Sequence, residues 1–157
     1  EVGHGTTVNI YLPRLLDADE LNETSEPEYP LTGDATETIL VVEDDPGVRE
    51  YIVETLQELK YRVLHAANGE LALKMLERDT DHLDLLLTDV VLPGINGRQL
   101  AEALRAKRPG LRTLYITGYS RNAIVHQGRL DPGVAMLQKP LTRTSLAQGI
   151  RRVLDGR

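Results

Sequence analysis

Residues 84–97 read DLLLTDVVLPGING, an apolar run that ends on the carboxylate of Asp89. Consecutive leucines without polar alternation are typical of a strand covered on both faces, as in a parallel sheet flanked by helices. Pro93, Gly94 and Gly97 then favour a turn that leads into a new helix. Because open parallel sheets bind ligands just beyond the carboxyl ends of their strands, we expect Asp89 to lie where chemistry takes place.

The composition of the chain limits the possible classes of function. Its 157 residues suffice for one ordinary domain with extensions. The net charge of -6, without basic clusters, argues against a nucleic acid or an anionic membrane as the partner. There is no cysteine, which excludes disulfides and cysteine-bound zinc. No segment approaches the roughly 18 apolar residues of a membrane span, and no signal-peptide pattern is present. We therefore expect a cytoplasmic chain, with any membrane anchor in a longer parent protein.

From residue 37 onward the sequence predicts strands and helices in strict alternation. Strands are expected at 38–42, 62–66, 84–89, 111–116 and 134–137, and helices at 46–59, 69–78, 99–106, 120–127 and after Thr142. Alternation with short loops requires parallel pairing through right-handed crossovers. We therefore predict an α/β fold with helices on both faces of a five-stranded parallel sheet, in the flavodoxin-like order 2-1-3-4-5.

Polar residues follow four of these strands, and the predicted order brings them to one edge of the sheet. Asp44, Asp45 and Asp89 follow the two central strands, while Thr117 and Lys139 follow the next two. Three carboxylates in a small cleft repel one another, and Mg2+ relieves the repulsion because it prefers oxygen ligands. The ammonium and the hydroxyl would meet incoming phosphoryl oxygens. This set of groups predicts phosphoryl transfer onto Asp89.

The same motifs resemble those of a known signalling family. Together they are similar to the motif set of the response-regulator receiver (CheY-like) domain, over residues 37–157; the motifs are Glu43-Asp44-Asp45, Asp89 with Leu92-Pro93 and Gly97, Thr117-Gly118, and Lys139-Pro140. The resemblance implies that Asp89 is the phosphoacceptor, that Lys139 pairs with the phosphoryl group and that Thr117 moves to bind it. It further implies that Mg2+ is held by Asp44, Asp45, Asp89 and the carbonyl of Val91. The implied partner is a histidine kinase or a histidine phosphotransfer domain, which donates the phosphoryl group from a phosphohistidine.

The chain departs from the family pattern at three positions. Met136 stands where the family often has a switching Tyr or Phe, so aromatic gating is not expected. Val91 and Tyr119 stand at the two positions that tune loss of the phosphoryl group in the family. Neither side chain readily positions a water molecule, so we predict slow self-hydrolysis of the aspartyl phosphate.

The first 36 residues have a different character. Residues 1–14 alternate like a strand, and the sequence from Gly3 to Pro13 resembles the last glycine box and final strand of the ATP-binding domain of sensor histidine kinases. The boxes that bind nucleotide in that family are absent, so this fragment is not expected to bind ATP. Residues 15–36 are acidic, contain no Lys or Arg, and predict an extended linker.

The whole chain is thus expected to be the C-terminal piece of a hybrid sensor histidine kinase; the alternative is a free-standing regulator with an N-terminal extension. No output domain follows the receiver, so the signal is expected to pass to another protein.

Two rival functions are disfavoured by the residues themselves. A Mg2+-dependent hydrolase of haloacid dehalogenase type would need a second Asp two residues after the first, where Val91 stands. A docking module that uses the fold without phosphorylation would not need the full motif set. A single Asp after a strand is most often a helix cap, and Lys-Pro is a common turn. The joint placement of these motifs at four strand ends is what favours a functional site.

Overall fold

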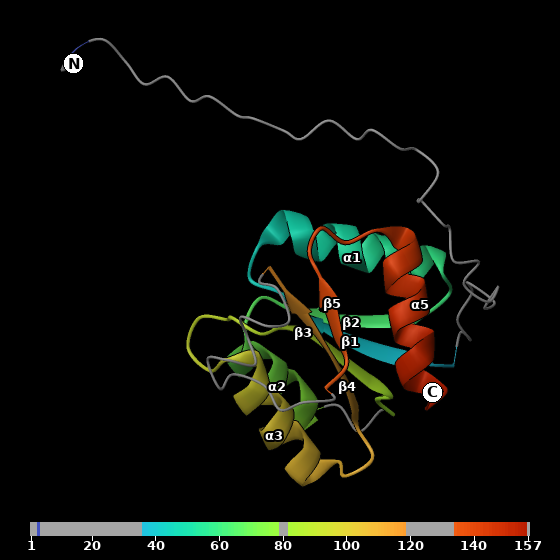
Figure 1. The fold of residues 1–157 in the computed structure, drawn as a ribbon. Coiled ribbons are helices and arrows are strands. Elements are labelled where there is room, and N and C mark those ends of the chain that lie inside the picture. Colours follow the sequence, from blue (N-terminus) through green and yellow to red (C-terminus); the bar gives the residue numbers. More distant parts are fainter. Residues whose placement is uncertain (1–2, 4–35, 79–81, 119–133, 157) are drawn as a thin grey trace.

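The computed structural model describes residues 3, 36–78, 82–118 and 134–156 of the chain. Strands and helices alternate along it (Figure 1). The elements are β1 (Thr38–Val42), α1 (Pro46–Glu58), β2 (Arg62–Ala66), α2 (Gly69–Arg78), β3 (Leu85–Asp89), α3 (Gly97–Lys107), β4 (Arg112–Thr117), β5 (Met136–Gln138) and α5 (Arg143–Leu154). The helix expected at 120–127, the strand in residues 1–14 and the linker at 15–36 lie outside the described residues.

The five strands form one parallel sheet in the order β2-β1-β3-β4-β5, which confirms the predicted topology. In the register of the sheet, Val42 of β1 lies beside Thr88 of β3, and Asp89 lies beside Ile116 of β4. The carboxyl ends of β1, β3 and β4 therefore meet at one edge.

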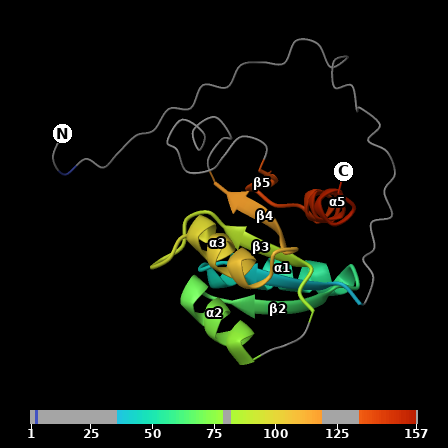
Figure 2. The same ribbon diagram turned by 90° about the horizontal axis from the view of Figure 1, so that it is seen from below.

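Helices cover both faces of the sheet, with α1 and α5 on one face and α2 and α3 on the other (Figures 1 and 2). Alternate side chains of a strand point to opposite faces, so Ile39 and Val41 pack with α1 and α5, whereas Leu40 and Val42 pack toward α2 and α3. Leu85, Leu86 and Leu87 are completely buried. Burial of such a side chain contributes about 1.5–3 kcal/mol. Burial on both faces is thus the physical reason for the uninterrupted leucine run.

Side-chain caps begin the helices. Asp45 caps α1 just before Pro46, Asn96 and Thr142 cap α3 and α5, and Asn68 accepts a hydrogen bond from the Leu71 backbone N–H at the start of α2. Capping satisfies backbone N–H groups that have no partner within the helix.

Several predicted boundaries were wrong by one or two residues. Helix α3 begins at Gly97 rather than Gln99, because Asn96 and Gln99 form a reciprocal capping box around the first turn. A Cβ at position 97 would collide with the Asp89 carbonyl, so glycine is required for this close approach. Strand β5 covers Met136–Gln138 rather than 134–137, and β4 covers Arg112–Thr117 rather than 111–116, because these are the residues that pair across the sheet.

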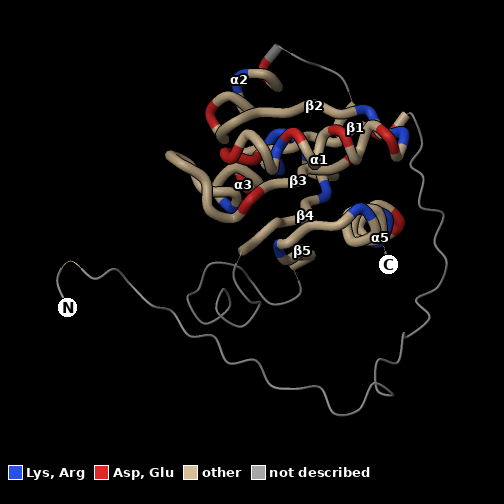
Figure 3. The backbone as a smooth tube through the Cα atoms, turned by 90° about the horizontal axis from the view of Figure 1, so that it is seen from above, with Lys and Arg blue, Asp and Glu red and all other residues tan. Residues whose placement is uncertain are grey.

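Charge is spread over the part of the chain that the structure describes. In Figure 3 the Lys and Arg positions are scattered over several elements rather than gathered on one face. Within the same residues, no helix is both long enough and apolar enough to cross a membrane.

Candidate functional site

The site lies at the carboxyl edge of the sheet and draws on four strands. Glu43 follows β1 directly, Asp89 ends β3, Thr117 ends β4 and Lys139 follows β5. Neighbouring parallel strands deliver their last residues to the same edge, which explains why residues far apart in the sequence meet here.

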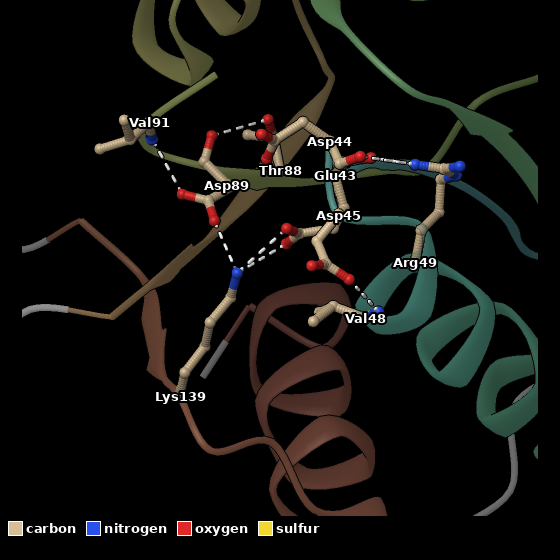
Figure 4. Close-up of polar contacts among 9 residues, drawn as sticks. All are labelled: Glu43, Asp44, Asp45, Val48, Arg49, Thr88, Asp89, Val91 and Lys139. Carbon is tan, nitrogen blue, oxygen red and sulfur yellow. Dashed lines mark hydrogen bonds and ion pairs between the residues drawn. The ribbon is translucent and has the colours of Figure 1, made fainter. Parts of the chain in front are cut away.

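An ammonium group joins two carboxylates at the centre of the site (Figure 4). Lys139 Nζ lies 2.7 Å from Asp89 Oδ2, and 2.9 and 3.1 Å from the two carboxylate oxygens of Glu43. Glu43 is only 1% exposed and Asp89 only 8%. The structure thus brings Asp89 and Lys139 together, as the sequence predicted, at a place largely shielded from water.

Burial and charge set the protonation of these groups. Burial raises the pKa of Glu43, and the nearby Asp89 charge raises it further, against the opposing effect of the Lys139 ammonium. For Lys139, burial alone would lower the pKa, but hydrogen bonds and charges from Asp89 and Glu43 outweigh burial and raise it. Lys139 therefore carries its positive charge at neutral pH.

Three carboxylates converge in the site and suit a hard divalent cation. Glu43, Asp44 and Asp89 each place a carboxylate oxygen within 4.8 Å of the oxygens of the other two, and no other such group of three or more occurs in the described residues. A single ammonium does not balance three negative charges, and carboxylate oxygens are the ligands that Mg2+ prefers. The donor set thus fits Mg2+.

Asp45 lies outside this group of three carboxylates. Its Oδ1 accepts a hydrogen bond of 2.9 Å from the Val48 backbone N–H, which makes it the cap of α1. From the sequence, Asp45 was predicted to be a metal ligand and Glu43 was not. Pro46 was the available signal, because proline at the first helical position indicates that the preceding residue is the cap.

Backbone groups orient the Asp89 carboxylate. The Val91 backbone N–H donates a 2.8 Å hydrogen bond to Asp89 Oδ1, while Oδ2 faces Lys139. The Val91 side chain is 52% exposed beside them. The role of the Val91 carbonyl as a metal ligand stays a prediction.

Thr117 is buried, at 3% exposure, and its carbonyl accepts a 2.8 Å hydrogen bond from the Lys139 backbone N–H. This bond ties the end of β4 to the residue that carries the ammonium. Movement of the Thr117 hydroxyl toward a phosphoryl group stays a prediction.

Comparison with known proteins identifies the family. The family model described as the response regulator receiver domain matches residues 39–151. The chain is 32% identical over 163 residues to the sensor kinase CckA of Brucella abortus (strain 2308), a match that covers 99% of this chain and 17% of the kinase. It is also 32% identical to the response regulator receiver protein CpdR of the same organism, over 74% of this chain and 95% of that protein.

Solved structures agree with this identification. The crystal structure of the receiver domain from the hybrid histidine kinase CckA is 34% identical, with a TM-score of 0.63, covering 74% of this chain and 98% of that one. The response regulator protein TrrA from Thermotoga maritima, in complex with Mg2+ and BeF, is 31% identical, with a TM-score of 0.62, covering 75% of this chain and 99% of that one. The chain therefore belongs to the response regulator receiver domain family of two-component signalling.

Proposed function

We propose that this receiver takes a phosphoryl group from a phosphohistidine onto Asp89, in a phosphorelay with a histidine kinase or a histidine phosphotransfer domain. The observation that carries the proposal is the partly buried contact between Lys139 and Asp89, 2.7 Å long, at the end of a central strand. An acid oriented by a backbone N–H and paired with a fixed ammonium is prepared to receive an anionic group.

In the proposed reaction an Asp89 carboxylate oxygen forms a bond to phosphorus while the P–N bond of the phosphohistidine breaks. The electron pair of that bond returns to the imidazole, which leaves and takes up a proton. The ammonium of Lys139 lies beside Asp89 and would neutralise charge on the phosphoryl oxygens, and the Thr117 hydroxyl would donate to another of these oxygens. The chemistry rests on positioning and charge, since the nucleophile is an ionised carboxylate.

Mg2+ is the cofactor that we propose for this step. Glu43, Asp44 and Asp89 would hold it, with the Val91 carbonyl and, through water, Asp45 as further ligands. When bound, Mg2+ supplies positive charge that offsets both the carboxylates and the phosphoryl oxygens.

Intact-protein mass spectrometry after incubation with acetyl phosphate tests the assignment of Asp89. We expect one added phosphoryl group that depends on Mg2+, no addition to Asp89→Asn, and normal addition to Asp84→Asn. Asp84 is a suitable control because it lies just before the same strand, where its Oδ2 accepts a hydrogen bond from the Thr38 backbone N–H. Equal phosphorylation of Asp89→Asn and the native chain would overturn the assignment.

We further propose that the chain is the C-terminal piece of a hybrid sensor histidine kinase that works in the cytoplasm. The match to the CckA kinase supports this, because it covers 99% of the chain and so extends beyond the receiver into the first residues. The match to almost the full length of CpdR instead favours the alternative, a free-standing regulator. Immunoblotting of the native source with an antibody against the receiver distinguishes them: a product far longer than 157 residues supports the hybrid kinase, and one of about this length supports the regulator.

A further inference from the structure

One side chain contacts the acidic loop, residues 43–45, from the side of α1. Arg49 NH1 donates to the Glu43 carbonyl at 2.7 Å and to the Asp44 carbonyl at 3.2 Å. The Arg49 backbone N–H donates to the carbonyl of Asp45 at 3.0 Å. The Arg49 side chain therefore binds two successive carbonyls of the acidic loop, and its backbone N–H makes the helical hydrogen bond to the third.

These contacts fix the loop from the side away from the phosphoacceptor. In Figure 4 the acidic residues lie between Arg49 and Asp89. The Glu43 backbone N–H is held separately, by a 3.3 Å hydrogen bond to the Ala66 carbonyl at the end of β2. The Glu43 backbone is thus held at both the N–H and the carbonyl, and its carboxylate lies against Lys139, which also contacts Asp89.

We propose that Arg49 is a positioning residue for the cation site. It holds the backbone of Glu43 and Asp44 so that their carboxylates meet Asp89 before any cation arrives. This inference rests on the proposed function, since it assumes that these carboxylates bind Mg2+. Removing a group that hydrogen-bonds to metal ligands and orients them typically weakens metal binding by about 10–100-fold.

The positive charge of Arg49 and its hydrogen bonds act on Mg2+ affinity in opposite directions. Charge alone disfavours a second cation nearby, so loss of the guanidinium would tighten Mg2+ binding. Loss of the hydrogen bonds frees the loop, which spreads the carboxylates and weakens binding. The sign of the change in affinity therefore separates positioning from simple electrostatics.

Titration with MgCl2, followed by the amide signals in NMR spectra, tests the inference on the whole 157-residue chain. We expect Arg49→Met, which keeps an apolar stem of similar length, to weaken Mg2+ binding by about 10-fold. Arg105→Met is the matched control, because it removes the same charge from an exposed position of α3 and should leave the affinity nearly unchanged. Equal or tighter binding by a folded Arg49→Met would overturn the inference.

A conservative variant covers the case in which Arg49→Met does not fold. Arg49→Lys keeps the charge but offers one nitrogen in place of a planar fork, so we expect Mg2+ affinity between those of the native chain and Arg49→Met. Native affinity in Arg49→Lys, if Arg49→Met is unfolded, would also overturn the inference. Failure of the native chain itself to bind Mg2+ would instead reject the proposed cation site, and the two failures are thereby distinguished.

Discussion

Two clusters of opposite charges lie at opposite ends of the sheet, and they are built differently. At the carboxyl edge, Lys139 joins Glu43 and Asp89. At the amino edge, Arg151 of α5 binds both oxygens of Glu37, just before β1, at 2.6 and 3.0 Å, and Asp155 at 2.7 Å. Each cluster has one cation between two acids, so composition alone does not distinguish them.

Geometry distinguishes the two clusters. Arg151 presents a planar fork that matches the Glu37 carboxylate, and it fixes the last turn of α5 to the start of β1. Lys139 is a compact charge whose carboxylate partners also belong to a group of three acids with Asp44. The Arg151 cluster is suited to hold two elements together, whereas the Lys139 cluster keeps an excess of negative charge that can take a cation.

The largest expected effect is on phosphorylation, in Lys139→Met. Removing one preorganised donor from a site of this kind costs about 10²–10³ in rate, so phosphorylation of Asp89 by acetyl phosphate should slow by that factor. The rate of mass gain, followed by intact-protein mass spectrometry, measures it. Arg151→Met is the counterpart at the other end of the sheet and should keep the native rate. Similar slowing in both variants would remove the distinction between the clusters.

The Arg151 cluster should matter for stability instead. Hydrogen bonds to charged groups contribute about 1.5–3 kcal/mol, and the Glu37 and Asp155 side chains are 21% and 34% exposed, which reduces the loss. We expect Arg151→Met to lower the free energy of unfolding by about 1–3 kcal/mol, measured by urea denaturation. Arg152→Met, at an exposed neighbouring position, should stay within about 0.5 kcal/mol of the native chain. Equal losses of unfolding free energy in the two variants would show that the Arg151 cluster makes no specific contribution to stability.

The fold was predictable because its signals are local and repeated. The leucine run of β3, the proline after Asp45 and the capping residues each indicate an element from a few neighbouring positions. Strict alternation then leaves few topologies, and the predicted order proved correct. Strand ends were less predictable, because pairing across the sheet decides them: β5 begins at Met136, where it pairs with Tyr115.

The site was predictable at its centre and less so at its margins. Asp89 ends the well-marked leucine strand β3, Lys139 follows β5, and the order of the strands brings them together. Among three consecutive acids, however, a shift of one residue decides which carboxylates lie beside Asp89, and Asp45 instead caps α1. The pairing of Arg151 with Glu37 spans 114 positions of sequence and leaves no local pattern.

A smaller effect is expected from substitution of Val91. This substitution tests how long an aspartyl phosphate at Asp89 would last before hydrolysis. The exposed Val91 side chain lies beside Asp89 and cannot orient a water molecule. We expect the aspartyl phosphate to persist well beyond about one minute, and Val91→Asn to lose it several-fold faster, because an amide can position the attacking water. Decay of the phosphorylated mass after removal of acetyl phosphate measures both rates. A native half-life below about one minute would contradict the prediction.

The smallest expected effect is a pH dependence that belongs to Glu43. Burial raises its pKa above the ordinary value of 4.5, so between 4.5 and the raised value the folded chain holds a proton that the unfolded chain has lost. The contribution of Glu43 to stability is therefore largest below pH 4.5 and declines as the pH rises through the folded pKa.

Glu43→Gln cannot ionise, so without Mg2+ its free energy of unfolding should decline less over this range than that of the native chain. Urea denaturation from pH 4.5 upward measures the difference. Glu50→Gln makes the same change at an exposed position of α1 and is the matched control. If the free energies of unfolding of Glu43→Gln and the native chain change with pH in parallel, burial does not raise the pKa of Glu43. The Lys139 cluster would then differ less from the Arg151 cluster than their geometry indicates.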